Sequence, residues 1–171
     1  MKIKTICIII ILLVSLFELS FAQKGFMKIG DIKGESTNRG HVDWINIEGF
    51  SQALEKEVAT TGATRRRSTV SFSDLVFIKK LDKSSPKLME ACAKGKVIPK
   101  VELDMVTQNG RTYYSVYLEK VLITGINSQS HCDPNCEVRE EVSISYSKIT
   151  WEYINENGEI VSTSYDVRSG N

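Results

Sequence analysis

Residues 81–96, LDKSSPKLMEACAKGK, decide the fold, because they predict a single helix within a chain that otherwise alternates like strands. Ser85 is suited to the N-cap, and Pro86 to the first helical position, where its missing N–H is not needed. Gly95 supplies a C-terminal stop. A helix this short is not stable alone in water, so we expect it to dock against an open side of the β structure.

Cys92 raises the question whether this helix carries chemistry. It lies one turn after Leu88, with Ala91 beside it, on a narrow apolar stripe. The two histidines, His41 and His131, are distant in the sequence, and no acyl-transfer motif surrounds either of them. We therefore expect a buried core cysteine and a structural helix.

Most of the remaining chain alternates between apolar and polar residues, which is typical of half-buried strands. Within residues 140–154 the alternation changes phase near Ser147, which indicates a bulge or a strand buried on both faces. Asn109-Gly110 predicts a two-residue hairpin turn, and Asn157-Gly158 predicts a second turn. The sum is a mainly β, antiparallel sandwich or barrel. The expected strands are residues 25–32, 42–50, 71–80, 100–105, 114–118, 140–154 and 160–167.

Residues 51–67 follow neither the strand period nor the helix period. We expect a long exposed loop there, and loops of this length in a compact domain are often functional. The loop contains three consecutive arginines, Arg65, Arg66 and Arg67, which favour a solvated basic surface.

Residues 1–22 have the three parts of a secretory signal peptide, with lysines first, an unbroken apolar run at residues 6–14, and small residues before the cleavage site. A membrane anchor is the rival interpretation. A spanning helix needs about 20 apolar residues, and polar residues interrupt this run too early. We expect cleavage between Ala22 and Gln23, which leaves a single domain at residues 23–171 without a membrane span.

The charge of the mature domain is balanced. The whole chain has 22 basic and 21 acidic residues, and the signal segment takes away Lys2, Lys4 and Glu18, which leaves 20 of each. A neutral balance argues against nucleic acid or an anionic membrane as the main partner. It also reduces repulsion between copies, which suits self-association.

Cys132 and Cys136 frame the turn-forming stretch CDPNC. Export leads to an oxidising compartment, where a disulfide closing this loop of about five residues would contribute roughly 2 kcal/mol. A metal site is the alternative, because His131 is adjacent. Two cysteines and one histidine lack a fourth zinc ligand at a usual spacing, so the disulfide is favoured.

Asp31, Glu35, His41 and Asp43 cluster around one predicted turn and contain the elements of an acid/base pair. Polar residues are common in turns for conformational reasons, which is the simpler explanation. The sequence shows no other catalytic, metal-binding or cofactor-binding constellation. We therefore expect a protein that is not an enzyme and that uses no cofactor.

Three stretches of the mature chain carry a resemblance to a known family. They are MKIGDIKGES at residues 27–36, LDKSSPKLMEACAKGKVIPK at residues 81–100 and EEVSISYSKITWEY at residues 140–153. In these stretches the chain resembles the Hcp family, the haemolysin-coregulated tube proteins of bacterial type VI secretion. The most specific part is the block at residues 82–86.

This resemblance implies a small β-barrel of two antiparallel sheets with one helix at its side. It also implies a non-enzymatic subunit that closes into a homo-hexameric ring, rings that stack into a tube, and secretion-system components or effector cargo as further partners. The family's loop after the second strand contributes to stacking, and residues 51–67 occupy that place. Arg65, Arg66 and Arg67 are therefore candidates for the assembly loop, although three arginines are unusual there.

The signal peptide departs from the family, because tube subunits assemble in the cytoplasm. Either the chain is an exported relative put to another use, in the periplasm or outside the cell, or the signal prediction is false. The CDPNC loop favours export, since a short disulfide has little purpose in a reducing cytosol. The alternative function is an exported β-sandwich binding module that kept the fold and does not assemble.

Export predicts the N-terminus of the mature protein. Protein recovered from the periplasm or the medium is expected to begin at Gln23, because the apolar run and the small residues before Ala22 form a cleavage site. N-terminal sequencing measures this directly. A soluble cytoplasmic pool that retains Met1 would contradict the prediction.

Overall fold

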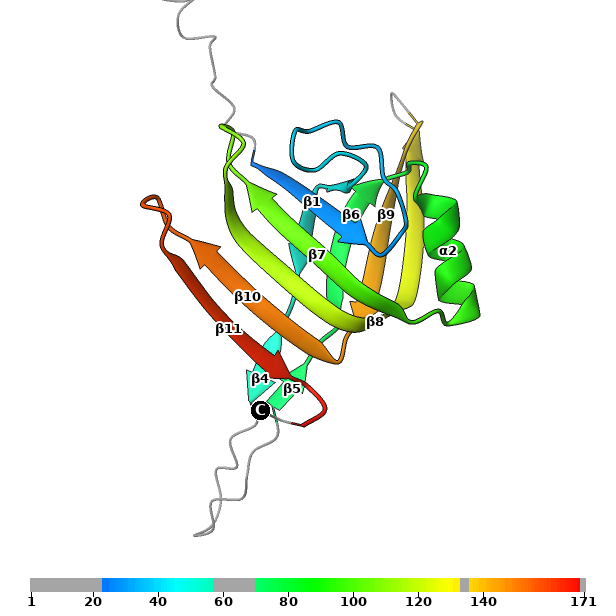
Figure 1. Ribbon diagram of the computed structural model, residues 1–171. Coiled ribbons are helices and arrows are strands. Elements are labelled where there is room, and N and C mark those ends of the chain that lie inside the picture. The colour runs from blue at the N-terminus through cyan, green and yellow to red at the C-terminus, as the bar shows by residue number, and fades with distance from the viewer. Residues whose placement is uncertain (1–22, 57–69, 133–135, 170–171) are drawn as a thin grey trace, which may run out of the picture.

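The computed structural model describes residues 23–56, 70–132 and 136–169. These residues form antiparallel strands and one helix, α2 (Ser85–Lys94), which lies at the side of the strands (Figure 1). The strands are β1 (Lys24–Ile29), β2 (Ile45–Ile47), β3 (Gly49–Ser51), β4 (Leu54–Lys56), β5 (Val70–Phe72), β6 (Leu75–Lys80), β7 (Ile98–Val106), β8 (Thr112–Cys132), β9 (Cys136–Ser145), β10 (Lys148–Ile154) and β11 (Ile160–Asp166).

Two sheets share the long strand β8. The first sheet has the order β2-β1-β7-β8-β10-β11, and the second has the order β8-β9-β6-β3. The first half of β8 pairs with β7 and β10, and the second half pairs with β9. The change of partner coincides with Lys120, whose φ is +53°, and with a register shift between Ile123 and Gly125. These irregularities bend one strand from the front sheet to the back sheet (Figure 1).

The segment of β2 and β3 connects the two sheets a second time. Only Glu48 separates β2, which pairs with β1, from β3, which pairs with β6. The Glu48 N–H donates to the carbonyl of Ile78 in β6 at 2.7 Å. The strand order β2-β1-β7-β8-β9-β6-β3 therefore begins and ends with two strands that are adjacent in the chain. This connection gives the two sheets a barrel-like arrangement.

The core lies between the two sheets and includes one side of the helix. Met27, Leu103 and Val116 stand in register across β1, β7 and β8, and all three are fully buried. Leu88 and Ala91 of α2 belong to the same apolar cluster. The helix therefore docks on the β structure, as the sequence predicts, and the two-sheet antiparallel fold with one short helix is confirmed.

A buried ion cluster joins the start of α2 to the second sheet. The Lys79 side chain is fully buried, and its Nζ atom lies 2.8 Å from both Glu140 Oε2 and Asp82 Oδ1. Lys79 also donates to the hydroxyl of Ser85 at 2.9 Å, and that hydroxyl donates to Glu140 Oε2 at 2.6 Å. We call these four residues the Lys79 cluster. Because β6 carries Lys79, β9 carries Glu140 and α2 carries Ser85, the cluster holds three elements against one another.

The helix begins one residue earlier than predicted. The N-cap position is Ser84, Ser85 is the first helical residue and Pro86 is the second, so both the predicted N-cap and the predicted first position are wrong by one residue. The Ser85 hydroxyl is engaged in the Lys79 cluster. Gly95 ends the helix in the left-handed conformation with a φ of +59°, as predicted. Cys92 packs against the core, as expected for a core cysteine, but it is only half-buried.

Both Asn-Gly turns are longer than two residues. In the β7–β8 turn, the N–H of Gly110 donates to the carbonyl of Thr107 at 2.9 Å, and the N–H of Thr107 donates to the carbonyl of Arg111 at 2.9 Å. The turn that contains Gly158 has the same pattern, and each glycine has a φ near +80°. These are three-residue turns with the glycine in the left-handed position, so the two-residue prediction at Asn109-Gly110 is wrong.

Three predicted segments divide where the chain changes partner. Residues 140–154 form β9 and β10 in different sheets, so the phase change near Ser147 marks a break between strands and neither a bulge nor a strand buried on both faces. Residues 42–50 begin pairing only at β2 and change sheet at Glu48, and residues 71–80 divide into β5 and β6. Part of residues 51–67 is β4, which pairs with β5.

The docked helix predicts a large effect of one core substitution. Leu88→Ala is expected to lower the free energy of unfolding by about 2–5 kcal/mol, because it removes a fully buried side chain from a short helix. The matched control is Met89→Ala at the next position, which is 42% exposed and should cost less than about 1 kcal/mol. Urea denaturation measures both. An unchanged midpoint for Leu88→Ala would contradict the docked helix.

The Lys79 cluster predicts that the stability of the fold depends on the pairing of the Lys79 ammonium with its carboxylates. Lys79→Met leaves two carboxylates near the buried site without their cation, so the free energy of unfolding should fall by about 3–5 kcal/mol. Adding Glu140→Leu should restore part of the loss, because the unpaired buried charge is then removed. The control is Lys80→Met, which breaks only an exposed pair with Glu137 and should cost less than about 1 kcal/mol. A double variant no more stable than Lys79→Met would show that the ion pairing is unimportant.

Candidate assembly surfaces and polar sites

The edge strand β11 leaves an unpaired row of backbone groups. Within the described residues it pairs only with β10, and its first five residues are exposed. Tyr153 of β10 and Val161 of β11 stand opposite each other on the face that continues the core, yet they are 51% and 63% exposed. On the same face, the aromatic ring of Phe72 stacks on the rings of Trp151 and Tyr165. Among the described residues, the ribbon of β10 and β11 therefore ends in an exposed apolar pair, Tyr153 and Val161. Figure 1 shows β11 as the outer strand of this ribbon.

The opposite face of the first sheet is charged. Four residues in register alternate in sign across β7, β8, β10 and β11: Lys100, Glu119, Lys148 and Asp166. The ammonium of Lys148 lies 3.1 Å from a carboxylate oxygen of Glu119. Backbone N–H groups of the turn after β11 lower the pKa of Asp166. The row thus ends in an ionised carboxylate at the free edge, with an apolar face on the other side of the same strand.

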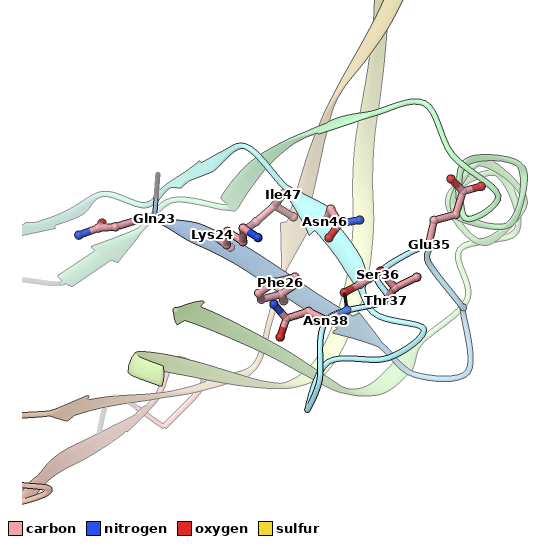
Figure 2. Close-up of a pocket in the computed structure, with 10 residues that line it drawn as sticks. Gln23, Lys24, Phe26, Glu35, Ser36, Thr37, Asn38, Asn46 and Ile47 are labelled. Carbon is pink, nitrogen blue, oxygen red and sulfur yellow. Dashed lines mark hydrogen bonds between the residues drawn. The ribbon is translucent and has the colours of Figure 1, made fainter. Parts of the chain in front are cut away.

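A polar hollow of about 480 Å³ lies beside β1 and β2. Figure 2 shows Asn46 of β2 above it and Ser36, Thr37 and Asn38 of the preceding loop at its side. Phe26 also lines the hollow, but it is only 2% exposed and its ring stacks on His41 at a centroid distance of 4.5 Å. The hollow therefore offers amide and hydroxyl groups to a polar ligand and no open aromatic face.

The histidine of the candidate acid/base group is a structural residue. His41 is 6% exposed and packs between the rings of Phe26 and Trp44. Its Nε2 lies 2.8 Å from Asp104 Oδ2, so the imidazole donates to that carboxylate. Ser115 donates to the other carboxylate oxygen at 2.6 Å. The low exposure of the ring leaves it inaccessible to a substrate.

The acidic residues of that group have other partners. Asp43 lies 2.9 Å from the ammonium of Lys33 and 3.3 Å from that of Lys83, and the hydrogen bond with Lys33 is the largest cause that lowers its pKa. Glu35 accepts the backbone N–H of Lys83 at 3.1 Å. Asp31 is exposed. None of these contacts joins two of the four residues, so the structure does not assemble the acid/base pair that the turn contains in principle.

The other predicted residues are divided between described and undescribed parts of the chain. Cys132 and Cys136 are joined as a disulfide where β8 and β9 meet. Within the described residues no three histidine, cysteine or acidic side chains gather as metal ligands. Gln23 accepts a hydrogen bond from the hydroxyl of Tyr113 at 2.8 Å. Ala22 and the three arginines at residues 65–67 lie outside the described residues.

The sequence interpretation missed the Lys79 cluster, although the strand alternation contains a signal for it. Lys79 follows Leu75 and Phe77 at every second position, and those two side chains are buried. Glu140 likewise precedes Val142 on the core face of β9. A lysine and a glutamate at core positions of two different strands predict a buried pair if the strands are neighbours.

Within the described residues no helix has the length and apolar character needed to cross a membrane.

Comparison with known proteins identifies the family. A family model described as "Type VI secretion system effector, Hcp" matches residues 26–153, which include all three stretches quoted above. "Protein hcp1" of Pseudomonas aeruginosa is 29% identical over 132 residues, covering 75% of this chain and 81% of that protein. The "Major exported protein" of the same organism is 27% identical over 137 residues, covering 72% and 76%. The crystal structure of Hcp1 from Salmonella typhimurium matches with a TM-score of 0.76 at 27% identity, covering 88% of this chain and 98% of that one. With its fold and its sequence matched along most of its length, the chain belongs to the Hcp family of type VI secretion proteins.

Proposed function

We infer that this protein is an exported, non-enzymatic structural subunit that closes into a ring with copies of itself. By resemblance to the Hcp family, the ring contains six copies. Its partners are then copies of the same chain, with secretion-system components or cargo as further candidates. Residues 1–22 act as the export signal, and residues 23–171 are the assembling domain.

The free edge of β11 carries this proposal. Tyr153 and Val161 extend the core face of the ribbon into solvent, beside backbone groups that no described strand pairs. An exposed strand edge with an apolar face invites pairing with another chain. In a ring of more than two copies, β11 meets a different surface on the next copy, so the contact is head-to-tail and the series ends only when the ring closes. Ring closure would cover every such edge in the assembly.

Charge supports close approach of copies. The mature domain has equal numbers of basic and acidic residues, so long-range repulsion is small. The alternating row ends at Asp166, whose carboxylate is ionised and lies at the edge of the proposed interface. A charge at the rim of an interface affects the alignment of the two copies more than their affinity. Stacking of rings should be weaker than ring closure, because Arg65, Arg66 and Arg67 place like charges where the family's rings meet.

Export is supported by the sequence of residues 1–22 and by the disulfide between Cys132 and Cys136. One relative bears the name "Major exported protein". An exported subunit is separated from an apparatus that assembles in the cytoplasm, so the ring would act in the periplasm or outside the cell.

The second candidate function is an exported binding module that keeps the fold and remains a monomer. The polar hollow beside β1 and β2 favours it, because Asn38 and Asn46 can hydrogen-bond a polar ligand there (Figure 2). Half of the residues that line the hollow are exposed, and its aromatic residue is covered, so it is a weaker observation than the free edge.

Ring closure predicts the mass of the exported protein. At low micromolar concentration, light scattering should give six times the mass of one mature chain. Val161→Lys should shift the protein to a monomer, because it places a charge on the uncovered apolar face. The matched control is Ser162→Lys, which adds the same charge at the next position of β11 on the opposite face and should keep most of the assembly.

Both substitutions are at exposed positions, so unfolding midpoints should match that of the unsubstituted protein. Higher salt should promote stacking of rings by screening the arginines. A protein that stays monomeric at high concentration would favour the binding module. Assembly that Val161→Lys leaves intact would place the interface elsewhere.

A further inference from the structure

The disulfide and one member of the Lys79 cluster, Glu140, lie on the same hairpin of β8 and β9. Glu140 of β9 stands opposite Ser128 of β8 on one side and opposite Lys79 of β6 on the other. Ser128 donates to Glu140 Oε1 at 3.4 Å, and Lys79 and Ser85 donate to Oε2. Glu140 is the last fully buried residue of β9 towards the turn, whereas Ser128 opposite it on β8 is exposed. We call the part of the hairpin beyond Glu140, which ends at Cys132 and Cys136, the hairpin tip.

Besides the disulfide, the hairpin tip is held by its own β8–β9 pairing, from Gln129 opposite Arg139 to Cys132 opposite Cys136, and by little side-chain burial. Its described side chains are exposed, apart from the half-buried Val138. The pairing of β6 with β9 ends at Arg139, and one further hydrogen bond runs from the N–H of Leu81 to the carbonyl of Val138 at 3.0 Å. Two exposed ion pairs, made by Glu137 and Arg139, add little in water. Segments with few buried apolar contacts open locally at low free energy.

Opening of the hairpin tip leads directly to a buried charge. Once the pairs beyond Glu140 separate, water reaches a carboxylate that is 1% exposed in the closed state. Glu140 can then turn away from Lys79, whose ammonium has no access to solvent. Ser85 loses its acceptor in the same step, so the first turn of α2 loses its attachment to β9. The disulfide restricts this opening because it holds the two strand ends together.

We propose that the Cys132–Cys136 disulfide is a redox-dependent latch for the docking of α2. In the reduced chain the hairpin tip opens as far as Glu140 and the helix start detaches more often. In the oxidised chain the hairpin tip stays closed and water does not reach the Lys79 cluster. The helix is therefore fully docked only after the protein leaves a reducing compartment. The latch operates within one subunit and is independent of ring closure.

The chemistry of the latch is thiol–disulfide exchange. Each cysteine loses its thiol hydrogen as one bond forms between the two Sγ atoms. The two electrons and two protons pass to an external disulfide, of a protein oxidant or a small molecule, whose S–S bond breaks to give two thiols. Reduction by a dithiol reverses the step.

Cys92 is a built-in reporter for this proposal, because it lies on α2 and is half-buried against the core. The test compares the exported, oxidised protein with its Cys132→Ser/Cys136→Ser variant. Both begin at Gln23 and therefore lack Cys7, so Cys92 is the one free thiol in each. Alkylation of Cys92 by iodoacetamide should be about tenfold faster in the variant, within the range set by closing a loop of about five residues. Ile149→Val is the matched control, since it weakens the core of the first sheet and leaves the hairpin intact, and should not change the rate.

Hydrogen exchange on the unsubstituted protein provides a second measurement. Adding a dithiol should speed exchange in α2 and in residues 127–132 and 136–141, while β10 and β11 keep their protection. Equal alkylation rates with and without the cysteine pair would overturn the proposal. An equal rise of exchange in β10 and β11 would also overturn it, because the disulfide would then stabilise the whole chain and not the helix start.

Discussion

The neutralisation of one buried ammonium group constrains much of this structure. Moving a charge out of water costs several kcal/mol, and that cost is offset only when counter-charges and hydrogen bonds are held in place. For Lys79 these partners come from β9, from α2 and from the turn before it. The helix is too short to be stable alone, so its first turn depends on this attachment and on the burial of Leu88. The block at residues 82–86, where the resemblance to the family is most specific, supplies Asp82 and Ser85 to the cluster.

The long strand β8 explains how one chain makes both a barrel-like core and an open edge. Its bend near Lys120 lets the second half turn into the second sheet beside β9. The first half stays in the first sheet and pairs with β10 on the side away from β7. The ribbon of β10 and β11 is therefore added outside the ring of strands that encloses the core. Its outer strand has no partner among the described residues, and this is the feature from which we infer assembly.

The charged and titratable side chains of this protein act mainly through structure. His41 is packed between aromatic rings and donates to Asp104, and Asp43 is held by two lysines. Among the described residues, these contacts join His41 and Asp43 to other partners and do not assemble an acid/base pair.

The sequence by itself determined the parts of the fold that depend on local physics. The alternation of apolar residues predicts the strands, Pro86 and Gly95 mark the helix, and the Asn-Gly pairs mark the turns. The tertiary structure decided which strands are neighbours, because hydrogen-bonded pairing between distant segments leaves no local pattern. It therefore decided that residues 140–154 divide between two sheets. It also made Ser85 a cluster ligand instead of the N-cap, since only the folded chain brings Glu140 and Lys79 to the helix start.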